Sequence, residues 1–248
     1  MFIIKDFQVS IAEKAIVKGI DLEVSPDTIH DLMVPNVSGK STLANSLMGH
    51  PKYTITKGKI LLDKQNITEL RPDQKAQAGL FLSLQYPPEI AGVTVAQFLR
   101  TAWQAVHQEK ISALDFFRFL QPKMALLNLE ESFAQRQLNV GFSGGEKKKM
   151  EMLQLITLEP KYAILDETDS GLDVDALKLI SKAIVSLKKS CHTGFIIITH
   201  YQRFLNHLTP DFVHVMSQGK IIRSGDKKLA KEIEKNGFST IKKPSKKK

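Results

Sequence analysis

Three consecutive residues, Gly39, Lys40 and Ser41, could bind the phosphates of a nucleotide. They match the second half of the phosphate-binding pattern G-x-x-x-x-G-K-[ST], in which the lysine reaches the β- and γ-phosphates and the serine hydroxyl ligates Mg²⁺. An apolar run precedes them, and a helical pattern follows over residues 41–48. A strand that turns into a helix in this way directs backbone N–H groups at an anion, so the sequence predicts a phosphate site here.

The first glycine of this pattern is absent, because position 34 is valine. Glycine tolerates a positive φ and lets a phosphate approach the backbone closely, whereas a β-branched residue in that conformation is strained. We therefore expect either a strained loop or a relaxed loop with weaker nucleotide binding. The candidate binding loop comprises nine residues: Val34, Pro35, Asn36, Val37, Ser38, Gly39, Lys40, Ser41 and Thr42.

A second candidate segment comes directly before the helical pattern of residues 147–158. Ser143, Gly144 and Gly145 leave several backbone N–H groups exposed at the positive end of that helix, which suits a second phosphate contact. The same three residues are also compatible with an ordinary glycine-rich turn in which serine caps the helix.

Two carboxylates and a histidine follow further apolar runs. Residues 162–165 lead into Asp166 and Glu167, and residues 195–199 lead into His200. Ligands of parallel sheets bind beyond the carboxyl ends of the strands. At that edge Asp166 could hold the hydration shell of Mg²⁺, and Glu167 could orient or deprotonate a water. The alternatives are an exposed loop start for the carboxylate pair and a structural role for His200.

The elements that position these residues alternate along the chain. Strand patterns occupy residues 2–9, 15–24, 28–33, 58–62, 79–84, 162–166, 195–199, 213–216 and 220–223, and helical patterns occupy 41–48, 71–78, 147–158, 176–187 and 229–236. Residues 94–138 are predicted to form a helical insertion, with Trp103 in its core. The fold class is therefore α/β with a mostly parallel core sheet and an antiparallel edge.

The strand at residues 28–33 enters the phosphate loop directly, so it should be central, parallel and covered on both faces. Asp31 fits poorly there, because a buried carboxylate without a partner costs several kcal/mol or takes up a proton. We expect either that Asp31 finds a donor, with His30 as the neighbouring candidate, or that the protein is less stable than the pattern suggests.

Composition excludes several classes of protein. No apolar run reaches the roughly 18 residues of a membrane span, and the first residues lack the pattern of a signal peptide. The single cysteine, Cys191, excludes a disulfide framework and a cysteine cluster for zinc or iron–sulfur, which fits a reducing cytoplasm. The formal charge is +9, to which the last seven residues contribute five lysines. That tail is expected to be a solvated segment, with nucleic-acid or membrane-surface contact as the alternative.

Together these motifs resemble the ABC-type ATPases, which are P-loop NTPases. Residues 34–42 are similar to the Walker A loop, Gln85 to the Q-loop, 142–146 to the signature, 164–167 to Walker B, 170–173 to the D-loop and 199–200 to the H-loop. More narrowly, residues 85–87, 139–148, 169–177 and 199–203 resemble SufC, the ATPase family of the SUF iron–sulfur cluster assembly system. Phe142 and Glu146 stand where transporter ATPases commonly carry Leu and Gln.

The resemblance implies a nucleotide-binding α/β core at residues 1–85 and 151–238, a helical subdomain with the signature at 86–150, and a lysine-rich tail at 239–248. It implies ATP and Mg²⁺ as cofactors, with Ser41, Gln85 and Asp166 as metal-site residues. It further implies a head-to-tail dimer that holds ATP between the phosphate loop of one copy and the residue 143–145 segment of the other. Glu167 would be the general base, and His200 and Gln85 would sense the γ-phosphate. The implied partners are SufB/SufD-type scaffold proteins.

Within the resemblance, Val37 is a second residue at a glycine position. The departures at positions 34 and 37 leave three readings open. The first is a working ATPase of the SufC type, the second is a relative that keeps the fold and partner surface but hydrolyses ATP poorly, and the third is the ATPase subunit of a membrane importer.

Overall fold

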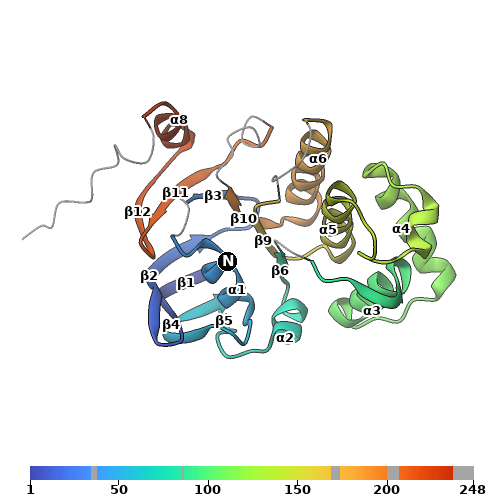
Figure 1. Cartoon of the computed structure of the whole chain (residues 1–248), viewed down its shortest axis with the longest axis horizontal. Helices are drawn as coiled ribbons and strands as arrows, with labels where there is room; N and C mark the ends of the chain where they lie inside the picture. The colour runs from blue at the N-terminus through green and yellow to red at the C-terminus, as the bar shows by residue number, and fades with distance from the viewer. Residues whose placement is uncertain (35–37, 85–86, 169–173, 200–206, 237–248) are drawn as a thin grey trace, which may run out of the picture.

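The computed structural model describes residues 1–34, 38–84, 87–168, 174–199 and 207–236 (Figure 1). Its central sheet has six strands in the order β12-β11-β3-β10-β9-β6. The pairs from β11 to β6 are all parallel, and β12 pairs antiparallel with β11 at one edge. These strands are β3 (Ile29–Met33), β6 (Leu80–Ser83), β9 (Tyr162–Asp166), β10 (Gly194–Thr199), β11 (Phe212–Ser217) and β12 (Lys220–Gly225).

Strand β3 lies between β10 and β11 and is buried along its whole length, which confirms the predicted central parallel strand. Successive side chains of β9 and β10 enter two different cores. Ile164 and Ile196 pack on one face, whereas Leu165 and Ile197 pack on the other. The sheet is therefore covered on both faces, as a parallel sheet requires.

An antiparallel sheet covers one of these faces together with helix α1 (Lys40–Met48). It has the order β2-β1-β4-β5, from β1 (Phe2–Ile11), β2 (Lys14–Val24), β4 (Thr54–Leu62) and β5 (Gln65–Asn66). Helix α1 contributes Leu43 and Leu47 to the shared core between the two sheets. The mixed α/β architecture with an antiparallel region confirms the predicted fold class.

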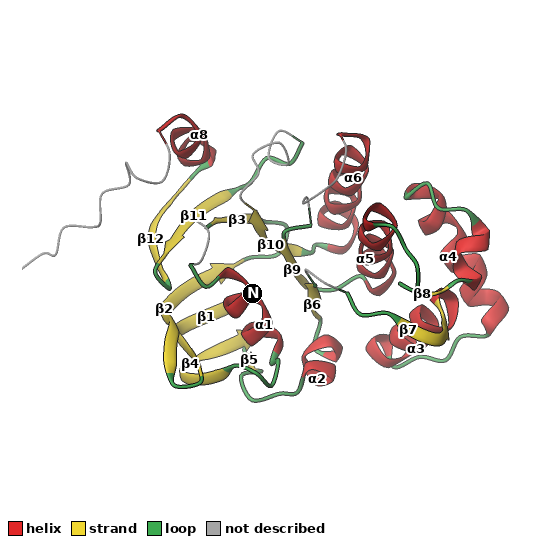
Figure 2. Ribbon diagram, viewed as in Figure 1, coloured by secondary structure: helices red, strands yellow, loops and turns green. Residues whose placement is uncertain are grey.

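Helices cover the opposite face and extend away from the sheet, as the red ribbons show (Figure 2). They are α3 (Val95–His107), α4 (Ala113–Leu126), α5 (Gly144–Leu158) and α6 (Val174–Cys191), with a short 3₁₀ helix η1 (Glu131–Gln135). The two remaining helices, α2 (Pro72–Gln77) and α8 (Lys227–Asn236), lie outside this group. Among the described residues, no helix combines the length and apolar content needed to cross a membrane.

The helical insertion differs in detail from its prediction. A short antiparallel pair of strands, β7 (Ile90–Thr94) with β8 (Gln137–Leu138), closes it, so Leu138 is strand rather than helix. Its helical part begins only at Val95, because the Thr94 side chain caps α3 and the chain before it is extended. Trp103 packs against Phe116 and Phe119 with ring centroids 6.5 and 5.9 Å away, which confirms its predicted place in the core.

Helix α5 crosses the boundary predicted between residues 150 and 151 without interruption. Its buried residues Leu153 and Ile156 belong to the same hydrophobic cluster as Leu99 and Leu120 of the insertion and Leu165 of the central sheet. One continuous core therefore joins the insertion to the sheet.

The expected pairing of Asp31 with His30 is wrong. Neighbouring side chains on a strand point to opposite faces, and both ring nitrogens of His30 bond elsewhere. Nδ1 lies 3.0 Å from His214 Nε2, and Nε2 lies 3.1 Å from Thr28 Oγ1. Burial lowers the pKa of His30 and of His214 to about 4, so both rings are neutral near pH 7.

Candidate active site

The predicted catalytic elements meet at one edge of the central sheet. In the parallel register, Ile198 pairs with Asp166, and Thr199 pairs with Met33. The carboxyl ends of β9, β10 and β3 therefore lie side by side, and α1 begins a few residues after β3. This is the edge at which parallel α/β sheets bind ligands.

Gly39 sets the start of α1. Its φ of 92° is in the left-handed region, and its backbone carbonyl accepts a hydrogen bond from the Leu43 N–H at 2.9 Å. A Cβ atom at this position would lie 2.9 Å from Ile16 Cγ2. Both the backbone conformation and the close approach of β2 therefore require glycine here. Lys40 and Ser41 follow in the first turn of the helix, where the N–H groups point out toward the site.

Ser41 and Asp166 form the part of the site that fits a metal ion. The Ser41 side chain lies next to the Asp166 carboxylate. Burial raises the pKa of Asp166, whereas the Ser41 hydroxyl and the nearby Lys40 and Lys148 ammonium groups lower it. Oδ1 of Asp166 is buried without a hydrogen-bond partner among the described residues. A hydroxyl and a carboxylate with spare acceptor capacity are the hard oxygen ligands that Mg²⁺ prefers, so these residues fit the ion.

Lys40 forms an ion pair with Glu167 across the same site. Both side chains are largely buried, at 15% and 8% exposure. Glu167 adopts a φ of 52°, which is uncommon for a residue other than glycine, and its backbone N–H donates to the Ile198 carbonyl at 2.9 Å. A left-handed residue fixed by its neighbours costs about 1–3 kcal/mol and is typical of functional sites. The structure thus brings Lys40, Ser41, Asp166 and Glu167 together.

Of the two outcomes expected for the loop, strain at Val34 is not the one that the structure shows. Val34 does not adopt a positive φ, and its side chain is 1% exposed within the core that α1 shares with the two sheets. The valine is therefore a packing residue at the end of β3, so its misfit to the glycine pattern does not distort its own backbone. Ser38 is half-buried and Thr42 is buried at the adjoining end of the loop. Pro35, Asn36 and Val37 lie outside the described residues, as do Gln85 and His200.

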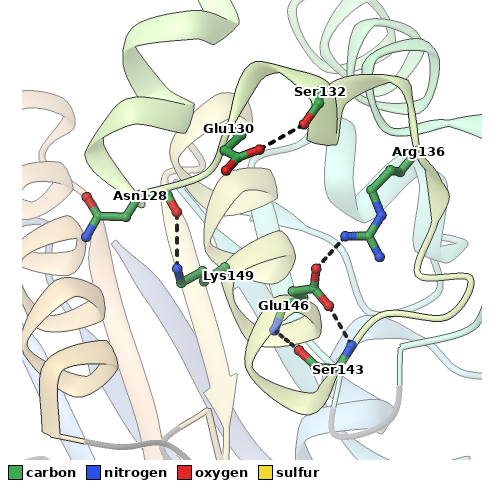
Figure 3. A network of polar contacts seen from close by, with 7 residues as sticks. All are labelled: Asn128, Glu130, Ser132, Arg136, Ser143, Glu146 and Lys149. Atoms are coloured by element: carbon green, nitrogen blue, oxygen red, sulfur yellow. Dashed lines mark hydrogen bonds and ion pairs between the residues drawn. The ribbon is translucent and has the colours of Figure 1, made fainter.

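The segment from Ser143 to Gly145 opens α5 as predicted. Ser143 caps the helix: its Oγ accepts from the Glu146 N–H at 3.2 Å, and its own N–H donates to Glu146 Oε2 at 2.7 Å (Figure 3). A Cβ atom at Gly144 or Gly145 would meet nothing within 4 Å, and neither glycine has a positive φ. Contacts among the described residues therefore do not require glycine at either position, whereas close approach by another molecule would.

A buried polar network beside Asp166 was missed by sequence reasoning. Lys148 Nζ lies 3.0 Å from Glu151 Oε2, and Ser83 Oγ donates to Glu151 Oε1 at 3.0 Å. Burial raises the pKa of Glu151. The signal that could have located this network is its spacing, since Lys148 and Glu151 share one helix face with the apolar Leu155.

Comparison with known proteins gives a consistent family. A family model described as "ABC transporter" matches residues 17–170. Vegetative protein 296 of Bacillus subtilis is 52% identical over 96% of this chain and 92% of its own length. A probable ABC transporter ATP-binding protein of Streptococcus pyogenes is 51% identical, over 96% of this chain and 93% of its own length. The dimeric structure of a bacterial ABC transporter cassette superposes with a TM-score of 0.79 at 17% identity, over 91% of this chain and 98% of the cassette. The chain belongs to the ABC transporter family, and it is an ATPase of the ABC type.

Proposed function

We propose that this chain is the ATPase subunit of a SUF-type iron–sulfur cluster assembly system, in which ATP hydrolysis changes the shape of bound SufB/SufD-type scaffold proteins. The observation that carries the catalytic part is the convergence of Lys40, Ser41, Asp166 and Glu167 at the carboxyl edge of the central sheet. The proposal places the protein in the cytoplasm.

The residues of this edge divide the catalytic work. Lys40 binds the β- and γ-phosphates, while Ser41 and Asp166 would hold Mg²⁺. When bound, Mg²⁺ neutralises charge on the phosphate oxygens. Glu167 is the general base that orients and deprotonates the attacking water. Because Lys40 pairs with Glu167 in the structure, a bound phosphate competes with Glu167 for the Lys40 ammonium. Weakening of that ion pair makes the carboxylate a better acceptor for the water proton.

The second half of the proposed site comes from another copy of the chain. In a head-to-tail dimer, Ser143, Gly144 and Gly145 of one copy face the phosphate loop of the other, which comprises residues 34–42. The open space over both glycines supports this arrangement, and so does the dimeric form of the similar cassette. Gln85 and His200 are proposed to contact the metal and the γ-phosphate, respectively. Residues 1–85 and 151–238 are proposed as the nucleotide-binding core and residues 86–150 as the helical subdomain.

The assembly role is supported by the segments that resemble SufC, including Phe142 and Glu146 in the signature. The single Cys191 agrees with a subunit that carries no cluster itself. A second candidate, the ATPase subunit of an ABC transporter, is favoured by the name of the Streptococcus pyogenes relative. A scaffold subunit that binds ATP poorly is the third candidate, and it is favoured by the valines at the glycine positions 34 and 37 and by the buried Asp31.

Steady-state ATP turnover, with and without co-expressed scaffold proteins, tests the proposal. We expect Glu167→Gln to lower turnover by about 10²-fold or more while ATP still binds, because the change removes a base but no phosphate contact. Glu109→Gln is a matched control, because Glu109 is exposed and lies between α3 and α4. Turnover that does not depend on Glu167 contradicts the catalytic assignment. Co-purification with membrane permeases in place of scaffold proteins contradicts the assembly role.

A further inference from the structure

Arg136 contacts the segment at the start of α5 from a neighbouring turn of chain. Its backbone N–H donates to the Phe133 carbonyl at 3.2 Å, and its carbonyl accepts from the Val95 N–H at 3.0 Å. The guanidinium carbon lies 4.4 Å from the ring centroid of Phe142 and 5.1 Å from that of Phe133. Since both rings are buried, the guanidinium is held against two fixed aromatic surfaces.

The same guanidinium is ion-paired with Glu146 (Figure 3). The two oxygens of that carboxylate have separate partners: Oε1 accepts from Arg136, and Oε2 accepts from the Ser143 N–H. The Ser143 N–H and the Arg136 guanidinium together lower the pKa of Glu146 to about 2, so the carboxylate is ionised at neutral pH. Arg136 therefore holds the Glu146 carboxylate in one orientation. In that orientation the carboxylate accepts the hydrogen bond from the Ser143 N–H.

A hollow of about 450 Å³ borders this group of residues. Arg136, Ser143, Gly145 and Glu146 contribute to its wall. None of the hydrogen bonds of Ser143 or Glu146 found among the described residues reaches residues 38–42 of the same chain. The conformation of the segment from Ser143 to Gly145 is therefore held by contacts with the helical insertion, and the side of this segment that borders the hollow is open.

We propose that Arg136 is a positioning residue for ATP bound by a second copy of the chain. Arg136, Phe133, Phe142 and Glu146 form a clamp, here called the Arg136 clamp, that sets the orientation of Ser143 before the partner's nucleotide arrives. Lysine cannot replace Arg136, because the clamp needs a flat guanidinium that stacks on rings and donates in a fixed direction. This inference rests on the head-to-tail dimer of the proposed function.

The test compares Arg136→Met, Arg136→Lys and Glu146→Ala, all in the Glu167→Gln background that traps the ATP-bound dimer. Affinity for ADP, measured on the monomer, should stay within about 2-fold, because the phosphate loop of the same chain is untouched. The ATP-dependent dimerisation constant, measured by sedimentation, should weaken about 10-fold in both Arg136 variants, which is the contribution of one charge-assisted hydrogen bond at a half-exposed site. Arg118→Met is the matched control, because the one ion pair of Arg118 within the described part of the chain is an exposed contact with Asp115 at 3.5 Å.

A double-mutant cycle tests whether Arg136 acts on Ser143 through the Glu146 carboxylate. Arg136→Met should have little further effect once Glu146 is Ala, since the two residues act as one unit. Additive losses, or dimerisation equal to that of the parent in Arg136→Met, would overturn the proposal.

Hydrogen exchange of the Ser143 N–H supplies a readout without nucleotide: faster exchange in Arg136→Met supports the clamp, and unchanged exchange overturns it. This measurement separates the clamp from the proposed function, which fails if the parent chain shows no turnover that depends on Glu167.

Discussion

Replacing Val34 with glycine restores the phosphate-binding pattern but should destabilise the protein. The side chain is 1% exposed in the core beside α1, so nearly all of its apolar surface is lost from that core. Burial of a valine side chain contributes about 1.5–3 kcal/mol. The added backbone freedom of glycine costs about 0.5–1 kcal/mol more. The expected loss in the free energy of unfolding is therefore about 2–4 kcal/mol.

Urea unfolding, followed by Trp103 fluorescence and circular dichroism, measures this loss as a lower midpoint at unchanged slope. Val34→Ala separates the two contributions, because it removes packing without adding backbone freedom. Val24→Ala is a matched control from the same core, since Val24 is fully buried and lies at the end of β2. ATP affinity of folded Val34→Gly should stay within about 3-fold, because the φ of Val34 is already relaxed. A tenfold gain in ATP affinity without loss of stability would refute the reasoning.

Three further predictions concern stability and are measured by the same unfolding assay. The pKa of about 4 for both His30 and His214 is below the unfolded value, so the unfolded state binds more protons as the pH falls from about 6.5 to 4. Stability should be full well above pH 6.5 and fall by roughly 5 kcal/mol, about 2.5 kcal/mol for each ring, on acidification to pH 4.5. The fall should be less steep in His214→Gln, and an equal slope in that variant contradicts the assignment. Leu99→Ala should lower the free energy of unfolding by about 2–5 kcal/mol, because Leu99 is fully buried in the insertion. Leu114→Ala, at a 61% exposed position, should lower it by less than about 0.5 kcal/mol. Equal losses would contradict the assignment of Leu99 to the hydrophobic core. Gly49→Ala should lower the free energy of unfolding by about 1–2 kcal/mol. Gly49 ends α1 with a φ of 85°, and a Cβ atom there would lie 3.1 Å from the Leu70 carbonyl oxygen. An unchanged stability would show that this turn relaxes without cost.

Periodicity and motif order predicted most of the fold. Strand β3, helix α1 with its stop at Gly49, and the β11–β12 hairpin all lie where the pattern placed them, since local sequence determines each of them. Strand β4 is longer than predicted, from Thr54 instead of residue 58. Gly58 interrupts its pattern with a φ of 101° where the Asp6 carbonyl approaches closely. Such an irregularity is set by the neighbouring strand, which a single segment does not reveal.

The sequence predicted the site residues that belong to a known motif. It did not predict contacts between residues that are far apart in the sequence. The motif assigned Lys40, Ser41, Asp166 and Glu167 correctly to one edge of the sheet. It did not predict the Lys40–Glu167 pair, because the two residues are far apart in sequence. Val34 was misjudged for the opposite reason: the pattern describes a backbone conformation, whereas the surrounding core determines what the residue does.

The uninterrupted helix α5 limits where this chain can recombine with a relative. A crossover between residues 150 and 151 would join the first half of one parent's helix, with Ser143 at its start, to the second half from the other parent, with Leu153 and Ile156 under the sheet. Leu153 and Ile156 of one parent would then pack against Leu99 and Leu120 of the other. Functional chimaeras should therefore exchange residues 90–158 as a block, with the later junction placed after Leu158.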